Sequence, residues 1–129
     1  MAACEVKLGE AATHAGDNAV AASYFGRALT IVKPLVAKET PDLDALCVAA
    51  DAYSGLGDLS RKEAQRPDQS AVRQESDWSY ARSWYEQSLR TWHRIEHPNR
   101  ATPNGFQVGD PASVVKKLKA TEAALASLR

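Results

Sequence analysis

The sequence has little that would direct it into a membrane or out of the cell. Its two cysteines, Cys4 and Cys47, have no CxxC motif or Cys/His cluster around them and cannot form a disulfide framework, so a reducing compartment fits best. No apolar run approaches the roughly 20 residues of a membrane span. Glu5, Lys7 and Glu10 interrupt the N-terminal stretch, where a signal peptide needs an apolar core. We therefore expect a cytoplasmic protein without a membrane partner.

The chain also lacks an excess of charge of either sign. It has 16 Lys and Arg against 16 Asp and Glu, and thus none of the positive field that binding to a phosphate backbone requires. We expect no nucleic-acid partner. Hydrophobic residues make up 44% and charged residues 25%, as in ordered globular proteins, and 129 residues are enough for one domain. The composition predicts a single folded domain over 1–129.

A pattern of small and aromatic residues recurs along the chain. Gly16-Asp17 and Gly57-Asp58 lie 41 positions apart, and each follows a stretch with apolar residues at helical spacing. Small residues let antiparallel helices approach closely, and an aromatic ring fills the gap between them. Each Gly-Asp pair predicts a turn with a permissive glycine and a carboxylate that caps the next helix. The recurring positions are Leu8, Gly9, Ala12, Gly16, Asp17, Ala21, Phe25 and Ala28, then Ala49, Ala50, Tyr53, Gly57 and Asp58, then Trp78, Ala81, Tyr85 and Ser88.

On these residues the chain resembles a tetratricopeptide repeat (TPR) protein. The family's order of Leu-Gly, Gly-Asp and Ala-x3-aromatic-x2-Ala is met between residues 8 and 28 and again, less completely, between 53 and 85. Its spacing exceeds the family's basic period of about 34, and so resembles the elongated variety found in kinesin light chains. The resemblance covers roughly 2–96. It implies an all-α antiparallel helix-hairpin solenoid, TPR-like, of about two repeats and a C-terminal capping helix.

The repeat pattern also suggests where the parts of the domain begin and end. The expected divisions are repeat one at 2–40, repeat two at 43–97 with an insertion at 59–77, a loop at 98–110 and a capping helix at 111–129. The insertion is expected to be partly a helical extension and partly a loop, because it is polar and contains Pro67. Pro34 should kink the second helix or end it near Lys33.

The most strongly marked helix is expected from about Asp77 to Glu96, ended by Pro98. Its apolar face predicts core positions, while Trp84 and Trp92 are the tryptophans most expected to reach a surface. The residues at helical spacing on this face are Trp78, Ala81, Tyr85, Leu89 and Trp92. The capping helix should begin at Asp110-Pro111, an N-cap residue followed by proline.

The resemblance implies a binding groove on the concave surface, which the first helix of each unit lines. The positions carried over are Val6, Glu10, Thr13, His14, Asp44, Cys47, Asp51 and Ser54. The best-known TPR proteins grip a peptide's terminal carboxylate with Lys, Asn and Arg at such positions, and none of the eight positions carries one of these residues. Glu10 and Asp51 instead predict an acidic, partly apolar groove that favours basic or apolar segments of a protein or peptide.

Catalytic motifs are weak in this sequence. His93-Arg94-Ile95-Glu96-His97 has the HxxEH form of inverted zinc peptidases, but Pro98 ends the helix at once, so solvated residues of a last turn are the better interpretation. Gly55-Leu56-Gly57 lacks the strand and the Lys-Ser/Thr of a phosphate loop. We expect no catalytic residue, no metal and no cofactor, and hence a non-catalytic scaffold for protein–protein interaction.

Two further expectations concern the setting of the domain. The runs AYSGLGDL and ARSWYEQSLRTW are similar to the C-terminal tails of bacterial serine/threonine protein kinases with TPR domains. A sensory or docking segment of such a kinase is therefore the alternative function. Met1-Ala2-Ala3 offers no helix cap, although the helical pattern is running by Val6. We thus expect either preceding repeats in a longer chain or a homo-oligomer.

Overall fold

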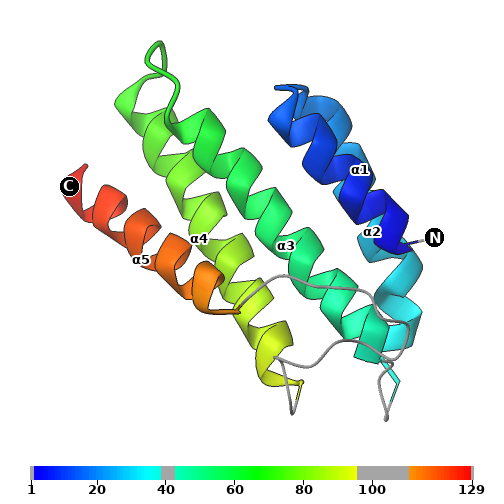
Figure 1. Cartoon of the computed structure of the whole chain (residues 1–129). Coiled ribbons are helices and arrows are strands. Elements are labelled where there is room, and N and C mark those ends of the chain that lie inside the picture. Colours follow the sequence, from blue (N-terminus) through cyan, green and yellow to red (C-terminus); the bar gives the residue numbers. More distant parts are fainter. Residues whose placement is uncertain (1, 39–42, 96–110, 129) are drawn as a thin grey trace.

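The fold consists of five α-helices, and each packs against the next along the chain as an antiparallel neighbour (Figure 1). The computed structural model describes residues 2–38, 43–95 and 111–128. The helices are α1 (Ala2–His14), α2 (Asn18–Val36), α3 (Leu43–Ala64), α4 (Ala71–His93) and α5 (Pro111–Ser127). In Figure 1, α3 lies at the centre, with α1 and α2 on one side and α4 and α5 on the other. The predicted all-α class is confirmed.

The core has two halves that meet at α3. One half joins α1, α2 and α3 around Phe25, Val32 and Val48. The other joins α3, α4 and α5 around Tyr85 and Trp92. Six consecutive residues of α3, 45–50, are buried, because the helix has neighbours on both sides. Among the described residues, no helix is both long enough and apolar enough to cross a bilayer.

The turn between α1 and α2 is the one that the sequence predicts. Gly16 has φ of +83°, a left-handed conformation that residues with a Cβ rarely adopt, and its amide donates to the Thr13 carbonyl oxygen. Asp17 occupies the N-cap position of α2, but its side chain makes no capping hydrogen bond. The predicted turn is therefore confirmed, and the predicted carboxylate cap at Asp17 is wrong.

Close helix packing in the first half depends on one aromatic ring. Phe25 of α2 is 1% exposed and lies between Gly9 of α1 and Gly55 of α3. A Cβ at Gly9 would lie 2.8 Å from the ring, and a Cβ at Gly55 would lie 2.3 Å from it, both well inside van der Waals contact. The two glycines are therefore required because the ring leaves no room for a side chain.

The Gly57-Asp58 turn that the repeat pattern predicts is wrong. Helix α3 continues through both residues to Ala64. Gly57 is needed for a different reason, since a Cβ there would lie 2.6 Å from the Tyr85 ring of α4. A glycine that allows close helix contact and a glycine that permits a turn look alike in a sequence.

The true turn between α3 and α4 lies several residues further on. Residues 59–64 extend α3, and residues 71–77, which the sequence assigns to the insertion, form the first turns of α4. Ser70 caps α4, because its hydroxyl accepts a hydrogen bond from the Arg73 amide at 3.2 Å. The expected loop is thus confined to residues 65–70, and α4 begins six residues earlier than expected.

Two other expectations about helix ends turn out differently. Pro34 lies inside α2, which ends at Val36, so the proline removes a hydrogen bond only in the last turn. Helix α4 ends at His93, whereas Pro98, the loop at 98–110 and the cap at Asp110 lie outside the described residues. Helix α5 begins at Pro111 as expected.

The tryptophans of α4 occupy different environments. Trp92 is 2% exposed and belongs to the core, so the expectation that it reaches the surface is wrong. It shares a face with Ser88, whose hydroxyl donates to the Ala50 carbonyl oxygen at 2.8 Å and so holds α4 close to α3. Trp84 is half-buried and stacks on Tyr53 of α3 with ring centroids 5.9 Å apart.

The C-terminal end of α3 is tied to the α1–α2 turn by polar contacts. Lys62 Nζ donates to the Thr13 carbonyl oxygen at 2.5 Å, and Asn18 Nδ2 donates to Glu63 Oε1 at 3.2 Å. The hydrogen bonds from Asn18 and then from Arg66 hold the pKa of the Glu63 carboxyl below its ordinary value. The ionised form of Glu63 is thus the form that the folded state favours.

We expect Gly55→Ala to lower the free energy of unfolding by about 1–3 kcal/mol, because the new methyl group overpacks against the Phe25 ring. Gly26→Ala is the matched control. Gly26 also lies inside a helix, but nothing lies within 4 Å of a Cβ there, so alanine should stabilise by about 0.5–1 kcal/mol. Urea unfolding of both variants measures the difference, and equal effects would contradict the packing role of Gly55.

Glu63 should contribute to the pH dependence of stability. A carboxyl whose pKa is lowered by folding stabilises above its unfolded pKa of about 4.3, and this contribution is lost as the pH falls through the folded value. We expect Glu63→Gln to lose less stability than wild type between about pH 5 and pH 3. Glu122→Gln, a change at an exposed site on α5, should keep the steeper wild-type loss. Urea unfolding across this range tests it, and parallel curves would refute the assignment.

Candidate functional site

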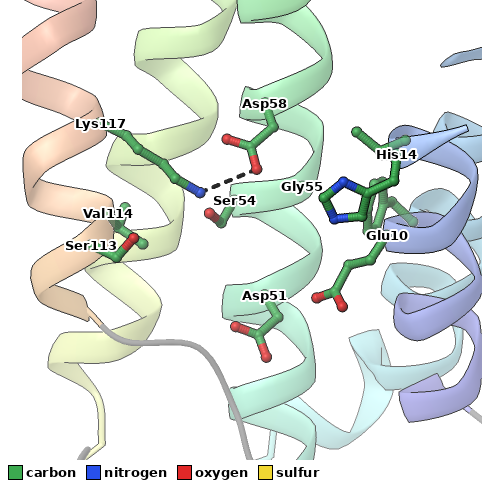
Figure 2. Close-up of a pocket in the computed structure, with 11 residues that line it drawn as sticks. Glu10, His14, Asp51, Ser54, Gly55, Asp58, Ser113, Val114 and Lys117 are labelled. Carbon is green, nitrogen blue, oxygen red and sulfur yellow. Dashed lines mark hydrogen bonds and ion pairs between the residues drawn. The ribbon is translucent and has the colours of Figure 1, made fainter. Parts of the chain in front are cut away.

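A groove of about 180 Å³ lies between α1, α3 and α5 (Figure 2). Five of the eight residues that the sequence assigns to a concave groove line it, namely Glu10, Thr13, His14, Asp51 and Ser54. The structure adds Phe25, Gly55, Asp58, Ser113, Val114 and Lys117. The groove thus combines residues from the first half of the chain with a wall from its C-terminal helix.

Helical spacing explains why these side chains meet. Glu10 and His14 are four residues apart on α1 and therefore share one face. Asp51, Ser54 and Asp58 follow each other at three and four residues on α3, which lies between α1 and α5, and Asp58 points toward Lys117 of α5 (Figure 2). Because Gly55 has no side chain, the Phe25 ring reaches the floor between the two helices.

Asp58 bonds to residues of two other helices. The Tyr85 hydroxyl donates to its Oδ1 at 2.5 Å, and Lys117 Nζ of α5 donates to its Oδ2 at 3.2 Å. Burial, and then the Asp58 charge, raise the pKa of the Tyr85 hydroxyl well above its ordinary value. Tyr85 therefore stays a neutral donor, and Asp58 joins α3 to both α4 and α5.

The groove has an acidic balance. Glu10, Asp51 and Asp58 bring three carboxyl groups, and the Lys117 amine is the one lysine or arginine group among those lining residues that the structure describes. Glu10 also lies 3.5 Å from the Lys7 amine on the exposed side of α1. Phe25 and Val114 add apolar surface. Such a surface attracts cations and apolar groups and repels anions.

Three residues that the sequence assigns to the groove lie elsewhere. Val6 is 0% exposed and packs in the core between α1, α2 and α3. Cys47 is buried on the side of α3 that contacts α4 and α5. Asp44 is half-buried near the start of α3 and does not line the groove. All three residues precede the groove-lining residues of their helices by one or two turns, where α1 and α3 have other neighbours.

The sequence interpretation missed Asp58 and the contribution of α5. Asp58 was assigned to a turn that does not exist, although its spacing from Asp51 and Ser54 carries the helical signal. Lys117 and Val114 belong to a helix that is distant in sequence from α1 and α3. No local pattern pairs Lys117 with Asp58, so only the packing of α5 on α4 reveals this wall.

The described residues offer little for nucleophilic or metal chemistry. Burial raises the pKa of the Cys47 thiol to about 11, with Asp51 and Asp44 adding to the effect. Among residues 2–38, 43–95 and 111–128, no group of three His, Cys, Asp or Glu side chains could hold a metal ion. His93 is exposed at the end of α4, and Glu96 and His97 of the HxxEH motif lie outside the described residues.

A second groove, of about 390 Å³, lies on α2, α3 and α4. Its apolar wall is formed by the stacked pair Tyr53 and Trp84, with Leu29 and Val36 of α2 opposite. Trp84, one of the two tryptophans expected to reach a surface, lines this groove and is half-buried. Unlike the first groove, it has no carboxyl group among its lining residues within 2–38, 43–95 and 111–128.

No protein-family model matches the sequence, and neither a curated protein nor a solved structure matches the chain. The resemblance to TPR proteins therefore rests on the residue pattern alone and stays a prediction. What the structure adds is the geometry of the groove between α1, α3 and α5.

The two cysteines should differ in reactivity. At pH 8 a thiol with a pKa of about 11 is about 0.1% thiolate, and Cys47 is also shielded from solvent, whereas Cys4 is exposed. We expect a chromogenic disulfide reagent to titrate one thiol rapidly in the native protein and the second only in denaturant. Cys4→Ser should abolish the rapid phase, and rapid reaction of both thiols in the native protein would contradict this assignment.

Proposed function

We propose that the chain is a non-catalytic scaffold that binds a protein or peptide partner in the groove between α1, α3 and α5. The observation that carries the proposal is the opposition of Glu10 on α1 to Asp51 on α3 above an apolar floor. A groove with charged walls and an aromatic floor suits an extended segment that alternates basic and apolar side chains.

A TPR-like solenoid is the architecture that we propose for this scaffold. It is supported by equivalent buried residues in α2 and α4, which follow the same spacing of small, aromatic, small and large side chains. In α2 these residues are Ala21, Phe25, Ala28 and Val32, and in α4 they are Ala81, Tyr85, Ser88 and Trp92. In each hairpin the aromatic ring also contacts a glycine of the preceding helix, Gly9 or Gly57. If the chain were instead a docking segment of a bacterial serine/threonine protein kinase, the partner would bind in the same groove.

The charge of the groove defines the class of ligand. A terminal carboxylate would meet three carboxyl groups, so we propose that the groove selects against the ligand of the best-known TPR proteins. A lysine or arginine of the ligand would instead gain charge-assisted hydrogen bonds. Lys117 of α5 already donates a charge-assisted hydrogen bond to the Asp58 carboxylate, which is the kind of bond that a lysine of the ligand would make.

We expect a short amidated peptide of alternating lysine and leucine to bind more tightly than the same peptide with glutamate in place of lysine. Fluorescence anisotropy at a protein concentration up to ~100 μM measures both. Glu10→Gln with Asp51→Asn should weaken binding of the basic peptide by about tenfold, because two attractive charges leave the groove.

The matched control is Asp68→Asn with Glu122→Gln, which removes the same net charge from exposed sites that do not line the groove. This variant should bind the basic peptide within about twofold of wild type at physiological salt, where distant exposed charges are screened. Equal weakening by both double variants would show that the overall charge, and not the groove, attracts the peptide.

A further inference from the structure

Lys117 occupies an unusual place on α5. The buried residues of this helix are Val114, Thr121 and Leu125, at a spacing that defines the face packed on α4. Lys117 lies three residues after Val114 and four before Thr121, so it belongs to the same side of the helix. A charged amine on this side needs a partner of opposite charge. Lys117 finds that partner on α3 and not on α4, as Figure 2 shows.

The partner of Lys117 is one particular oxygen of the Asp58 carboxylate. The amine lies 3.2 Å from Oδ2, whereas Oδ1 accepts the hydrogen bond of the Tyr85 hydroxyl. Because Tyr85 stays protonated in its buried position, Oδ1 remains occupied from the core. Oδ2 is therefore the oxygen through which Asp58 can meet a cation in the groove, and Lys117 holds it.

Helix α5 does not need this ion pair to stay attached. It packs on α4 through Val114, which belongs to the second half of the core, and Leu118 packs against the same cluster. The ion pair is partly exposed, with 30% of the Lys117 side chain and 35% of the Asp58 side chain accessible to solvent. Pairs of this kind contribute little to stability. The Lys117 amine can thus leave Asp58 while α5 remains packed on α4.

Lys117 takes the position that a lysine of the ligand would take. Val114 and Lys117 both line the groove, and together they present one apolar and one basic side chain to it from a single helix. This is the combination that the proposed ligand carries. A ligand amine at Asp58 would make the bond that Lys117 makes now, so it must displace Lys117 or be repelled by it.

We propose that the contact between Lys117 and Asp58 is autoinhibitory, with Lys117 acting as a built-in competitor for the basic partner. The inference rests on the proposed function, because it concerns the regulation of the same groove. Asp58 is one of the three carboxyl groups that line the groove, and the contact withholds it from a ligand. Turning the Lys117 side chain away, or neutralising its amine, releases the inhibition without movement of the helices.

We expect Lys117→Ala to bind the peptide of alternating lysine and leucine about threefold to fivefold more tightly than wild type, the range that a partly exposed ion pair supports. Lys117→Met, which keeps the apolar stem of the side chain, should show the same gain. Lys116→Ala is the matched control, because Lys116 is exposed on the same helix and does not line the groove. Fluorescence anisotropy measures all four proteins, and an equal gain for Lys116→Ala would overturn the proposal.

Asp58→Asn tests whether the gain comes from Asp58. An asparagine there keeps an oxygen for the Tyr85 hydroxyl but loses the charge for which the two amines compete. In this background, Lys117→Ala should change the affinity by less than about 1.5-fold. If Lys117 acted only by repelling the peptide at a distance, its removal would give the same gain in both backgrounds. That result would contradict competition for Asp58.

The outcomes also separate this inference from the proposed function. If wild type and Lys117→Ala bind the peptide equally, the contact is not autoinhibitory and the proposed function stands. If only Lys117→Ala binds at up to ~100 μM, the contact is autoinhibitory and the groove binds peptide in its released form. If neither binds, the released carboxylate accepts no ligand amine, and both proposals are overturned. Circular dichroism should show wild-type helicity for every variant, because α5 keeps its apolar contacts with α4.

Discussion

The structure depends on the contact between one ring and two glycines. Phe25 occupies the space that side chains at Gly9 and Gly55 would fill, so α1, α2 and α3 meet around a single aromatic residue. The same principle applies at Tyr85 and Gly57 in the second half of the core. Because glycine removes the side chain but keeps the helix, the helices approach closely without a break in their backbone hydrogen bonds. The groove exists because this close approach leaves the polar faces of α1 and α3 opposite each other.

The sequence predicted those features that local patterns determine. The Gly16 turn, the start of α5 and the buried positions Ala81 and Tyr85 of α4 all follow from spacing or from turn chemistry within a few residues. Gly57-Asp58 could not be interpreted in this way, because glycine has two uses and only the position of Tyr85 decides between them. The insertion at 59–77 was a consequence of that one error, since a turn placed too early leaves residues unassigned.

The candidate site likewise has residues that local patterns predict and residues that they do not. Glu10, His14 and Asp51 were predicted because they lie on the first helix of each hairpin, at positions that helical spacing can identify. Val6 and Cys47 lie one turn before Glu10 and Asp51 on the same helices but are buried in the core, because the neighbours of a helix change along its length. Lys117 depends on the packing of a distant helix, which a sequence pattern does not encode.

The two bonds to Asp58 have a consequence for the attachment of the last helix. A single carboxylate holds the Tyr85 hydroxyl in the core and the Lys117 amine on α5, so these helices share one electrostatic anchor. Helix α5 is therefore held by two kinds of contact, namely apolar packing on α4 and an ion pair with α3 that is partly exposed to solvent and thus weakened by salt.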